Sequence, residues 1–143
     1  MKITAVVMMI LATTAYSQNR ASDNELTYFP SAPKYQCMDF QKASAQYLTA
    51  LSSENAGVVE SALAHVAMMK VMLPACNFKQ LKAKVEEMAI SAGSIETRYK
   101  AFLVKSVLDE PEMFNRIAYA RYDSAEEWLG AISSRMGQTV AAR

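Results

Sequence analysis

Residues 56–73 read AGVVESALAHVAMMKVML, and this stretch decides the fold class. Its apolar residues recur at spacings of three and four, which predicts a helix over about residues 58–73. Pro74 follows the stretch and cannot continue a helix interior. Ser52–Gly57 precedes the expected helix and is rich in Ser, Asn and Gly, which break helices. The stretch therefore predicts one long, apolar helix with a defined start and end.

Similar periods lie on both sides of this helix. They predict further helices over about residues 37–51, 77–90, 94–108 and 125–136, and another that begins near Asp109–Pro111. Ile95, Tyr99, Phe102 and Leu103 share one side of the helix expected at 94–108. Ser124 and Glu127 have the spacing of a capping box. With only 4 Gly and 4 Pro, the chain lacks the turns of a β-sandwich, so we expect an all-α fold of about five to six helices.

An internal similarity suggests how these helices are arranged. AGVVES at 56–61 matches AGSIET at 92–97, and each copy opens an expected helix. A repeat of about 36 residues is typical of stacked helix pairs. Residues 37–136 thus resemble HEAT-type α-solenoid repeats, and the resemblance implies a short right-handed stack of about three helical hairpins. It carries no catalytic residues and implies a surface for protein binding, although three hairpins offer little concave surface.

The N-terminus has the pattern of a secretory signal peptide. Lys2 precedes the apolar run 3–12, and small residues at Ala15 and Ser17 suit a signal peptidase. The run is too short for a membrane span, which needs about 20 apolar residues. We therefore expect residues 1–17 to be removed and the protein to be secreted or periplasmic; the alternative is a buried N-terminal helix. Residues 18–36, with Pro30 and Pro33, predict an extended leader, and residues 137–143 a flexible tail.

The charge balance is nearly neutral, with 15 Lys and Arg against 14 Asp and Glu. The basic residues are scattered, whereas nucleic-acid binding needs them clustered. We therefore expect no nucleic-acid partner, and no membrane insertion after signal cleavage. The sequence has no Gly-rich phosphate loop and no zinc-ligand spacing, so no cofactor is expected.

Two cysteines remain in the expected mature chain, Cys37 and Cys76. In an exported protein an even number of cysteines predicts a disulfide. Closing this loop of about 40 residues would stabilise the fold by about 3–4 kcal/mol. The alternative is a pair of free, buried thiols.

A histidine and three methionines gather on one arc of the apolar helix, at His65, Met68, Met69 and Met72. The arc points away from the one that carries Val59, Leu63 and Val66. Imidazole and thioether ligands suit Cu(I) and similar soft ions, so a soft-metal site is one hypothesis. The other is core packing, because methionine fills irregular gaps between helices.

A basic and aromatic group could bind a partner, since Arg and Tyr are favoured at binding hot spots. Its members are Arg98, Tyr99, Lys100, Arg116 and Arg121, and the alternative is a solvated helix face. The acidic groups suit helix ends better than catalysis, and the single histidine limits any catalytic triad. The sequence therefore favours a non-enzymatic protein that binds a protein partner or assists envelope assembly. The alternatives are a soft-metal binder and an exported inhibitor or immunity-type protein.

Overall fold

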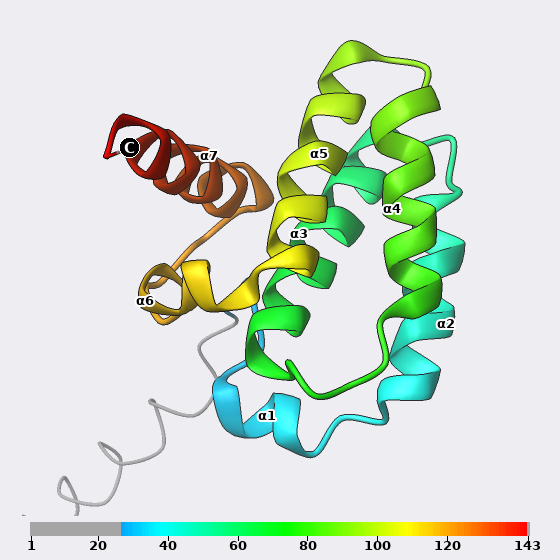
Figure 1. Cartoon of the computed structure of the whole chain (residues 1–143). Coiled ribbons are helices and arrows are strands. Elements are labelled where there is room, and N and C mark those ends of the chain that lie inside the picture. Colours follow the sequence, from blue (N-terminus) through cyan, green and yellow to red (C-terminus); the bar gives the residue numbers. More distant parts are fainter. Residues whose placement is uncertain (1–26, 143) are drawn as a thin grey trace, which may run out of the picture.

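The computed structural model describes residues 27–142, and it is all-helical over that range, with no strand among the described residues (Figure 1). The all-α prediction is confirmed. The expected signal peptide, residues 1–17, lies outside the described residues. Between Thr27 and Ala142 no helix combines the length and the apolar character that crossing a bilayer requires.

The helices follow one another with short connections. They are α1 (Ala32–Gln36), α2 (Phe40–Leu51), α3 (Ala56–Met72), α4 (Lys79–Ser91), α5 (Ile95–Asp109), the 3₁₀ turn η1 (Pro111–Phe114), α6 (Asn115–Ala118) and α7 (Ala125–Ala141). The long helices agree with the predicted ranges to within a few residues. The helix expected after Pro111 is instead a 3₁₀ turn followed by a single α-helical turn.

Two helical hairpins form most of the domain. The α2–α3 and α4–α5 hairpins lie side by side, with α2 against α4 and α3 against α5 (Figure 1). α7 does not extend this stack as a third hairpin would, because it packs against both α3 and α5. The predicted stack of about three hairpins is therefore not confirmed, although its first two members are present.

The two copies of the internal similarity occupy different positions in their helices. Asn55 caps α3, and its Oδ1 accepts hydrogen bonds from the backbone N–H of Gly57 (2.9 Å) and Val58 (3.2 Å). Ser94 caps α5 and accepts from Thr97 N–H (3.0 Å). In the sequence match, Ser94 aligns with Val58, which is already inside α3. The match thus reflects two helix starts that are out of step, rather than one structural unit repeated in register.

α3 is the central helix of the domain. It packs against α1, α2, α5, η1, α6 and α7. Leu63 and Val66 are fully buried, and Met68 and Met69 on the other arc are at most 2% exposed. Trp128 from α7 and Phe114 from η1 complete the same core. An apolar helix with no polar face is stable only when other elements surround it, and that is the arrangement here.

Both expected ends of the domain contain more helix than predicted. In the leader, α1 forms with a proline in its first turn, where the missing N–H costs nothing. Phe29 and Tyr35 hold this segment because both side chains are buried in the core. At the other end, α7 continues to Ala141, through the residues expected as a tail. There Thr139 Oγ1 contacts Arg135 O (3.1 Å) and the sulfur of Met113 (3.8 Å), which ties the last turns to η1.

Candidate functional site

The outer face of α5 carries three large apolar side chains that remain exposed. Ile95, Tyr99 and Phe102 are 77%, 51% and 48% exposed, and their spacing of four and three places them along one line of the helix. Leu103, which the sequence grouped with them, is buried. The buried face consists of Ala101, Leu103, Val104, Val107 and Leu108. α5 therefore has apolar residues on two faces, of which only one meets the core.

Polar contacts fix the edges of this outer face. Arg98 Nη1 donates to Ala92 O (3.0 Å), a carbonyl at the end of α4. The Tyr99 hydroxyl pairs with Ser133 Oγ of α7 (2.7 Å). Both residues belong to the basic and aromatic group predicted from the sequence. Their polar atoms are partly engaged within the fold, while the Tyr99 ring stays half exposed.

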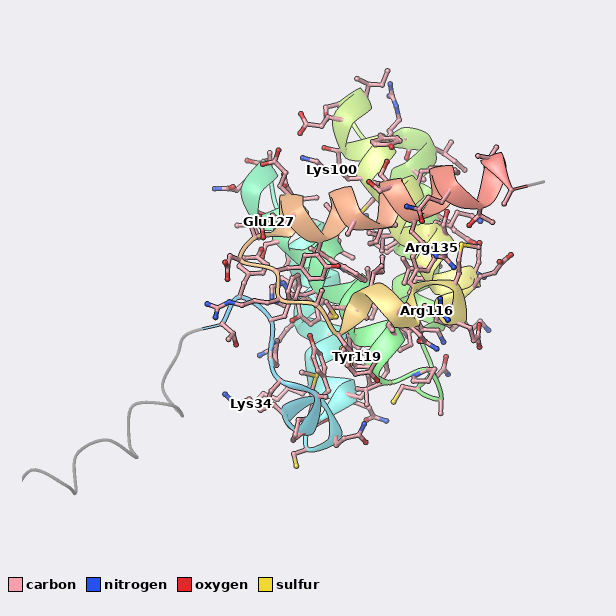
Figure 2. All side chains as sticks on the ribbon, turned by 90° about the vertical axis from the view of Figure 1, so that its left-hand side faces the viewer. Lys34, Lys100, Arg116, Tyr119, Glu127 and Arg135 are labelled. Carbon is pink, nitrogen blue, oxygen red and sulfur yellow. The ribbon has the colours of Figure 1, made fainter. Side chains whose placement is uncertain are left out.

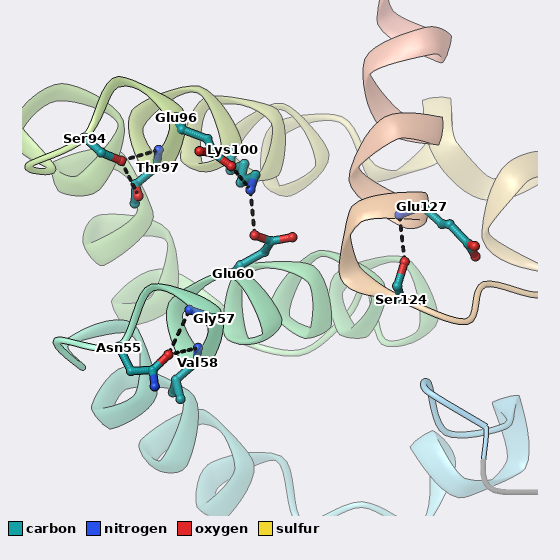
Figure 3. A network of polar contacts seen from close by, with 10 residues as sticks. All are labelled: Asn55, Gly57, Val58, Glu60, Ser94, Glu96, Thr97, Lys100, Ser124 and Glu127. Atoms are coloured by element: carbon teal, nitrogen blue, oxygen red, sulfur yellow. Dashed lines mark hydrogen bonds and ion pairs between the residues drawn. The ribbon is translucent and has the colours of Figure 1, made fainter.

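Lys100 has a structural role between α3 and α5. Its ammonium group pairs with Glu60 of α3 (2.6 Å) and with Glu96 of α5 (Figure 3). Burial lowers the pKa of Lys100, but the hydrogen bonds that it donates to the two carboxylates outweigh this effect and leave the pKa above its ordinary value. The same contact lowers the pKa of Glu96. Lys100 thus joins two helices and does not belong to the exposed face.

Arg116 and Arg121 lie away from the α5 face. Figure 2 shows Lys100 and Arg116 on opposite sides of α7. Arg116 is exposed on α6, and Arg121 pairs through Nε with Asp123 Oδ1 (3.0 Å) in the connection to α7. The five residues that the sequence grouped therefore do not form one surface. Arg98 and Tyr99 remain together on α5, and the other three have separate positions.

The histidine and methionine cluster belongs to two environments. Met68 and Met69 are buried in the core, and Met72 is partly buried against it. His65 has both ring nitrogens next to backbone oxygens, with Nδ1 2.9 Å from Ser61 O and Nε2 3.2 Å from Tyr28 O. Neither nitrogen is free to bind a metal together with the thioethers. Within residues 27–142, no group of three or more His, Cys, Asp or Glu side chains could hold a metal ion.

Cys37 and Cys76 are both free cysteines in the structure, so the predicted disulfide is not formed there and stays a prediction. Cys37 is exposed after α1, and Cys76 is partly buried in the α3–α4 connection. These two connections lie at the same end of the hairpins (Figure 1). The rings of Phe40 and Phe78, which follow the cysteines closely, are 4.8 Å apart. The two thiols therefore flank a direct contact between the two connections.

The acidic groups are at the surface. Asp109, Glu110 and Glu112 are exposed, as are Glu126 and Glu127, and no polar or charged residue between 27 and 142 is buried. The predicted cap is confirmed: Ser124 Oγ accepts from Glu127 N–H (3.2 Å; Figure 3), and Glu127 accepts from Asp123 N–H (2.8 Å). These carboxylates serve helix starts, where negative charge is favoured.

A hollow of about 370 Å³ lies between the turns of the two hairpins. Ser53, Glu54, Lys84, Glu87 and Thr97 are among its lining residues. Lys84 and Glu87 pair with each other across 3.4 Å, so the hollow presents no unpaired charge from these two residues. It therefore has less binding chemistry than the α5 face.

No protein-family model, curated protein or solved structure matches the chain. The feature that sequence reasoning missed is the exposure of Ile95 and Phe102. A signal for it was present in the sequence. Ile95, Tyr99 and Phe102 lie on one arc of the helix, and Val104, Val107 and Leu108 lie on another, so one apolar arc exceeds what a helix at the edge of the domain can bury.

Proposed function

We propose that this protein is a small, exported, non-enzymatic module that binds a protein partner through the outer face of α5. One observation carries the proposal. Ile95, Tyr99 and Phe102 form an apolar and aromatic line that is about half exposed or more, on a helix whose opposite face is fully packed. This is the surface chemistry by which a protein partner gains binding energy.

The energetic argument rests on the water contact of these side chains. Each Å² of apolar surface removed from water contributes about 25 cal/mol, so covering three large side chains would favour a complex by a few kcal/mol. Aromatic residues and arginine dominate binding hot spots, and Arg98 and Tyr99 are consecutive residues of this helix. Single exposed apolar residues are ordinary on protein surfaces. Three along one helix line are less so, and a group of exposed apolar side chains is typical of interaction sites.

The non-enzymatic part of the proposal rests on the placement of the ionisable groups. General acid–base catalysis uses desolvated carboxylates or histidines whose pKa values are shifted towards neutrality. The carboxylates with lowered pKa here, Glu96 and Asp109, are ion-paired at the surface. They are held charged in structural contacts, which favours a binding role over a catalytic one.

Export follows from the N-terminal pattern and is tested by the mature N-terminus. We expect the protein isolated from the medium or envelope of its own cells to begin at Gln18, by N-terminal sequencing and intact mass. Recovery of the chain in the cytosol with residues 1–17 still attached would contradict export, and it would leave the α5 proposal standing.

Site-specific crosslinking tests the binding surface. A photoreactive phenylalanine analogue replaces Phe102 in one variant and Gln41, an exposed residue on α2, in the matched control. We expect a defined crosslinked partner from Phe102 and none from Gln41. The partner is then purified, and Phe102→Ala should weaken its affinity about tenfold or more. Equal crosslinking at both positions, or unchanged affinity, would contradict the proposal.

The identity of the crosslinked partner separates the remaining alternatives. A structural envelope component would support the assembly role. An enzyme whose activity falls in the complex would support the inhibitor or immunity-type role. Both outcomes use the same face of α5, so the surface assignment is tested before the biological role.

A further inference from the structure

His65 lies where the segment 27–30 crosses α3. Its Nδ1 is 2.9 Å from the carbonyl oxygen of Ser61, one turn earlier in α3. Its Nε2 is 3.2 Å from the carbonyl oxygen of Tyr28 in the crossing segment. The imidazole therefore spans two parts of the chain that are far apart in sequence, and it is a candidate for holding them together.

The chemistry of the two partners fixes the charge that suits this arrangement. A backbone carbonyl oxygen only accepts hydrogen bonds, so each of the two contacts needs an N–H on the ring. A neutral imidazole has a single N–H and leaves a nitrogen lone pair facing the other carbonyl. The imidazolium form has two N–H groups and satisfies both oxygens at once. The geometry thus favours the charged ring.

The surroundings of the ring also suit a cation. The ring centroids of Phe29, Tyr28 and Tyr47 lie 4.8, 5.0 and 6.0 Å from that of His65. At such distances aromatic rings attract a cation when they present their faces, and the Tyr47 ring is stacked on the imidazole, with 22° between the planes. His65 is only partly buried, so water limits the cost of carrying the charge.

Each element packed around His65 contributes titratable groups that can be named. Tyr28 comes from the crossing segment and Tyr47 from α2, while Tyr47 in turn acts on Tyr35 of α1. Burial raises the pKa of Tyr47 above its ordinary value, and the nearby Tyr28 raises it further. Burial likewise raises the pKa of Tyr35. The raised pKa values keep Tyr35 and Tyr47 neutral between about pH 5 and 8, the range in which histidine changes charge.

We propose that His65 is a proton-operated clasp that holds the segment Tyr28–Pro30 on α3. The clasp is closed when the imidazolium donates to both carbonyls. It loosens when the ring loses a proton, because one of the two hydrogen bonds is then lost. The charged ring can donate to both carbonyls and the neutral ring to only one, and histidine side chains change between these forms between about pH 5 and 8.

Opening the clasp would expose apolar surface beside it. Phe29 and Pro30 line a hollow of about 290 Å³ with Met68 of α3 and with Tyr119 and Tyr122 of the segment before α7. Loosening the crossing segment removes one wall of this hollow. The clasp is independent of the proposed function, which concerns the outer face of α5, and either one can fail without the other.

Nuclear magnetic resonance tests the clasp directly, because His65 is the chain's single histidine and its ring signals are unambiguous. We expect both ring nitrogens to carry protons at about pH 5.5, with strong nuclear Overhauser contacts from the ring to Phe29 and Tyr28. At about pH 8 these contacts should fall by about half or more. A singly protonated ring at about pH 5.5, or contacts of equal strength at the two pH values, would overturn the proposal.

Two variants separate the proton from the packing. In His65→Gln, chemical shifts of the Tyr28 and Phe29 rings should no longer depend on pH in this range, since the titrating group is gone. Tyr28→Phe removes the hydroxyl that donates to Ser61 Oγ (2.8 Å) and keeps both carbonyls, so the pH dependence should persist. If His65→Gln does not fold, Tyr28→Phe and the wild-type titration still decide the proposal. Loss of the pH dependence in Tyr28→Phe would contradict it.

Discussion

α3 and α5 are neighbouring helices of similar length, and each is the second helix of a hairpin, yet they meet solvent differently. α3 is enclosed by α1, α2, α5, η1, α6 and α7, and its buried residues include both Leu63 and Met69. α5 is covered by α3, α4 and α7 on its inner side, and Ile95, Tyr99 and Phe102 remain exposed on its outer side. Both helices carry apolar residues on two arcs, but only α3 has neighbours for both.

The difference teaches that an apolar residue at helical spacing has two possible meanings. On α3 such residues make the fold stable, whereas on the outer face of α5 they contribute little to stability and are available to a partner. Substitutions at matched positions on the two helices distinguish the two cases.

The largest contrast is between Leu63 and Ile95. Leu63→Ala leaves a cavity at a fully buried position and should lower the free energy of unfolding by about 4 kcal/mol. Ile95→Ala removes an exposed side chain and should change it by less than about 0.5 kcal/mol. Denaturant unfolding of both variants measures the two values. Similar losses in the two variants would erase the distinction between the helices.

Oxidation of Cys37 and Cys76 to a disulfide should stabilise the α3 end of the domain further. A bridge between the α1–α2 and α3–α4 connections would fasten the end of α3 and raise the free energy of unfolding by about 3 kcal/mol. Two thiols lose two protons and two electrons to a disulfide oxidant such as oxidised glutathione. Peptide mapping without reduction should find the Cys37–Cys76 crosslink. The variant Cys37→Ser cannot form the bridge and serves as the matched control. If the wild-type protein forms only mixed disulfides with glutathione, the bridge is contradicted.

Lys100 is an ionic link between α3 and α5, so its substitution measures how much this link contributes to stability. Lys100→Met keeps the aliphatic part of the side chain and removes the pairs with Glu60 and Glu96. We expect a loss of about 1 kcal/mol in the free energy of unfolding, decreasing with added salt, since the pairs are only partly buried. Lys34→Met, at an exposed position on α1, is the control and should have no measurable effect.

The smallest effect concerns the far end of α5. Burial raises the pKa of Asp109, but hydrogen bonds from Lys105 and Lys82 outweigh this and leave the pKa below its ordinary value. A carboxylate whose folded pKa is lowered contributes stability above its unfolded pKa, and that contribution is lost as the pH falls through the folded value. In Asp109→Asn the free energy of unfolding should therefore decrease less than in the wild type as the pH falls below about 4. Identical acid unfolding of variant and wild type would argue against this contribution.

Most of the fold could be predicted from residue patterns. The positions of α3, α4, α5 and α7 follow from apolar spacing and from caps such as Ser124. The position of α7 could not be predicted, because the spacing of apolar residues does not show which helices α7 packs against. The match that suggested a repeat came from two helix starts, one inside α3 and one before α5.

The candidate site was predicted only in part. Tyr99 and Arg98 were found because aromatic and basic residues together are typical of binding surfaces. Lys100 was grouped with them because sequence spacing does not reveal Glu60, which lies 40 residues away and pairs with it. The sequence could not show that His65 meets two carbonyls, because backbone partners have no sequence signature.

The stability of a double variant shows whether the outer face of α5 is free surface. Ile95→Gln combined with Phe102→Gln keeps helix propensity and removes most of the exposed apolar line. If this face is free surface, the free energy of unfolding should stay within about 1 kcal/mol of the wild-type value. A loss of about 3 kcal/mol or more would show that these side chains belong to the core, and the α5 face would then not be a contact surface.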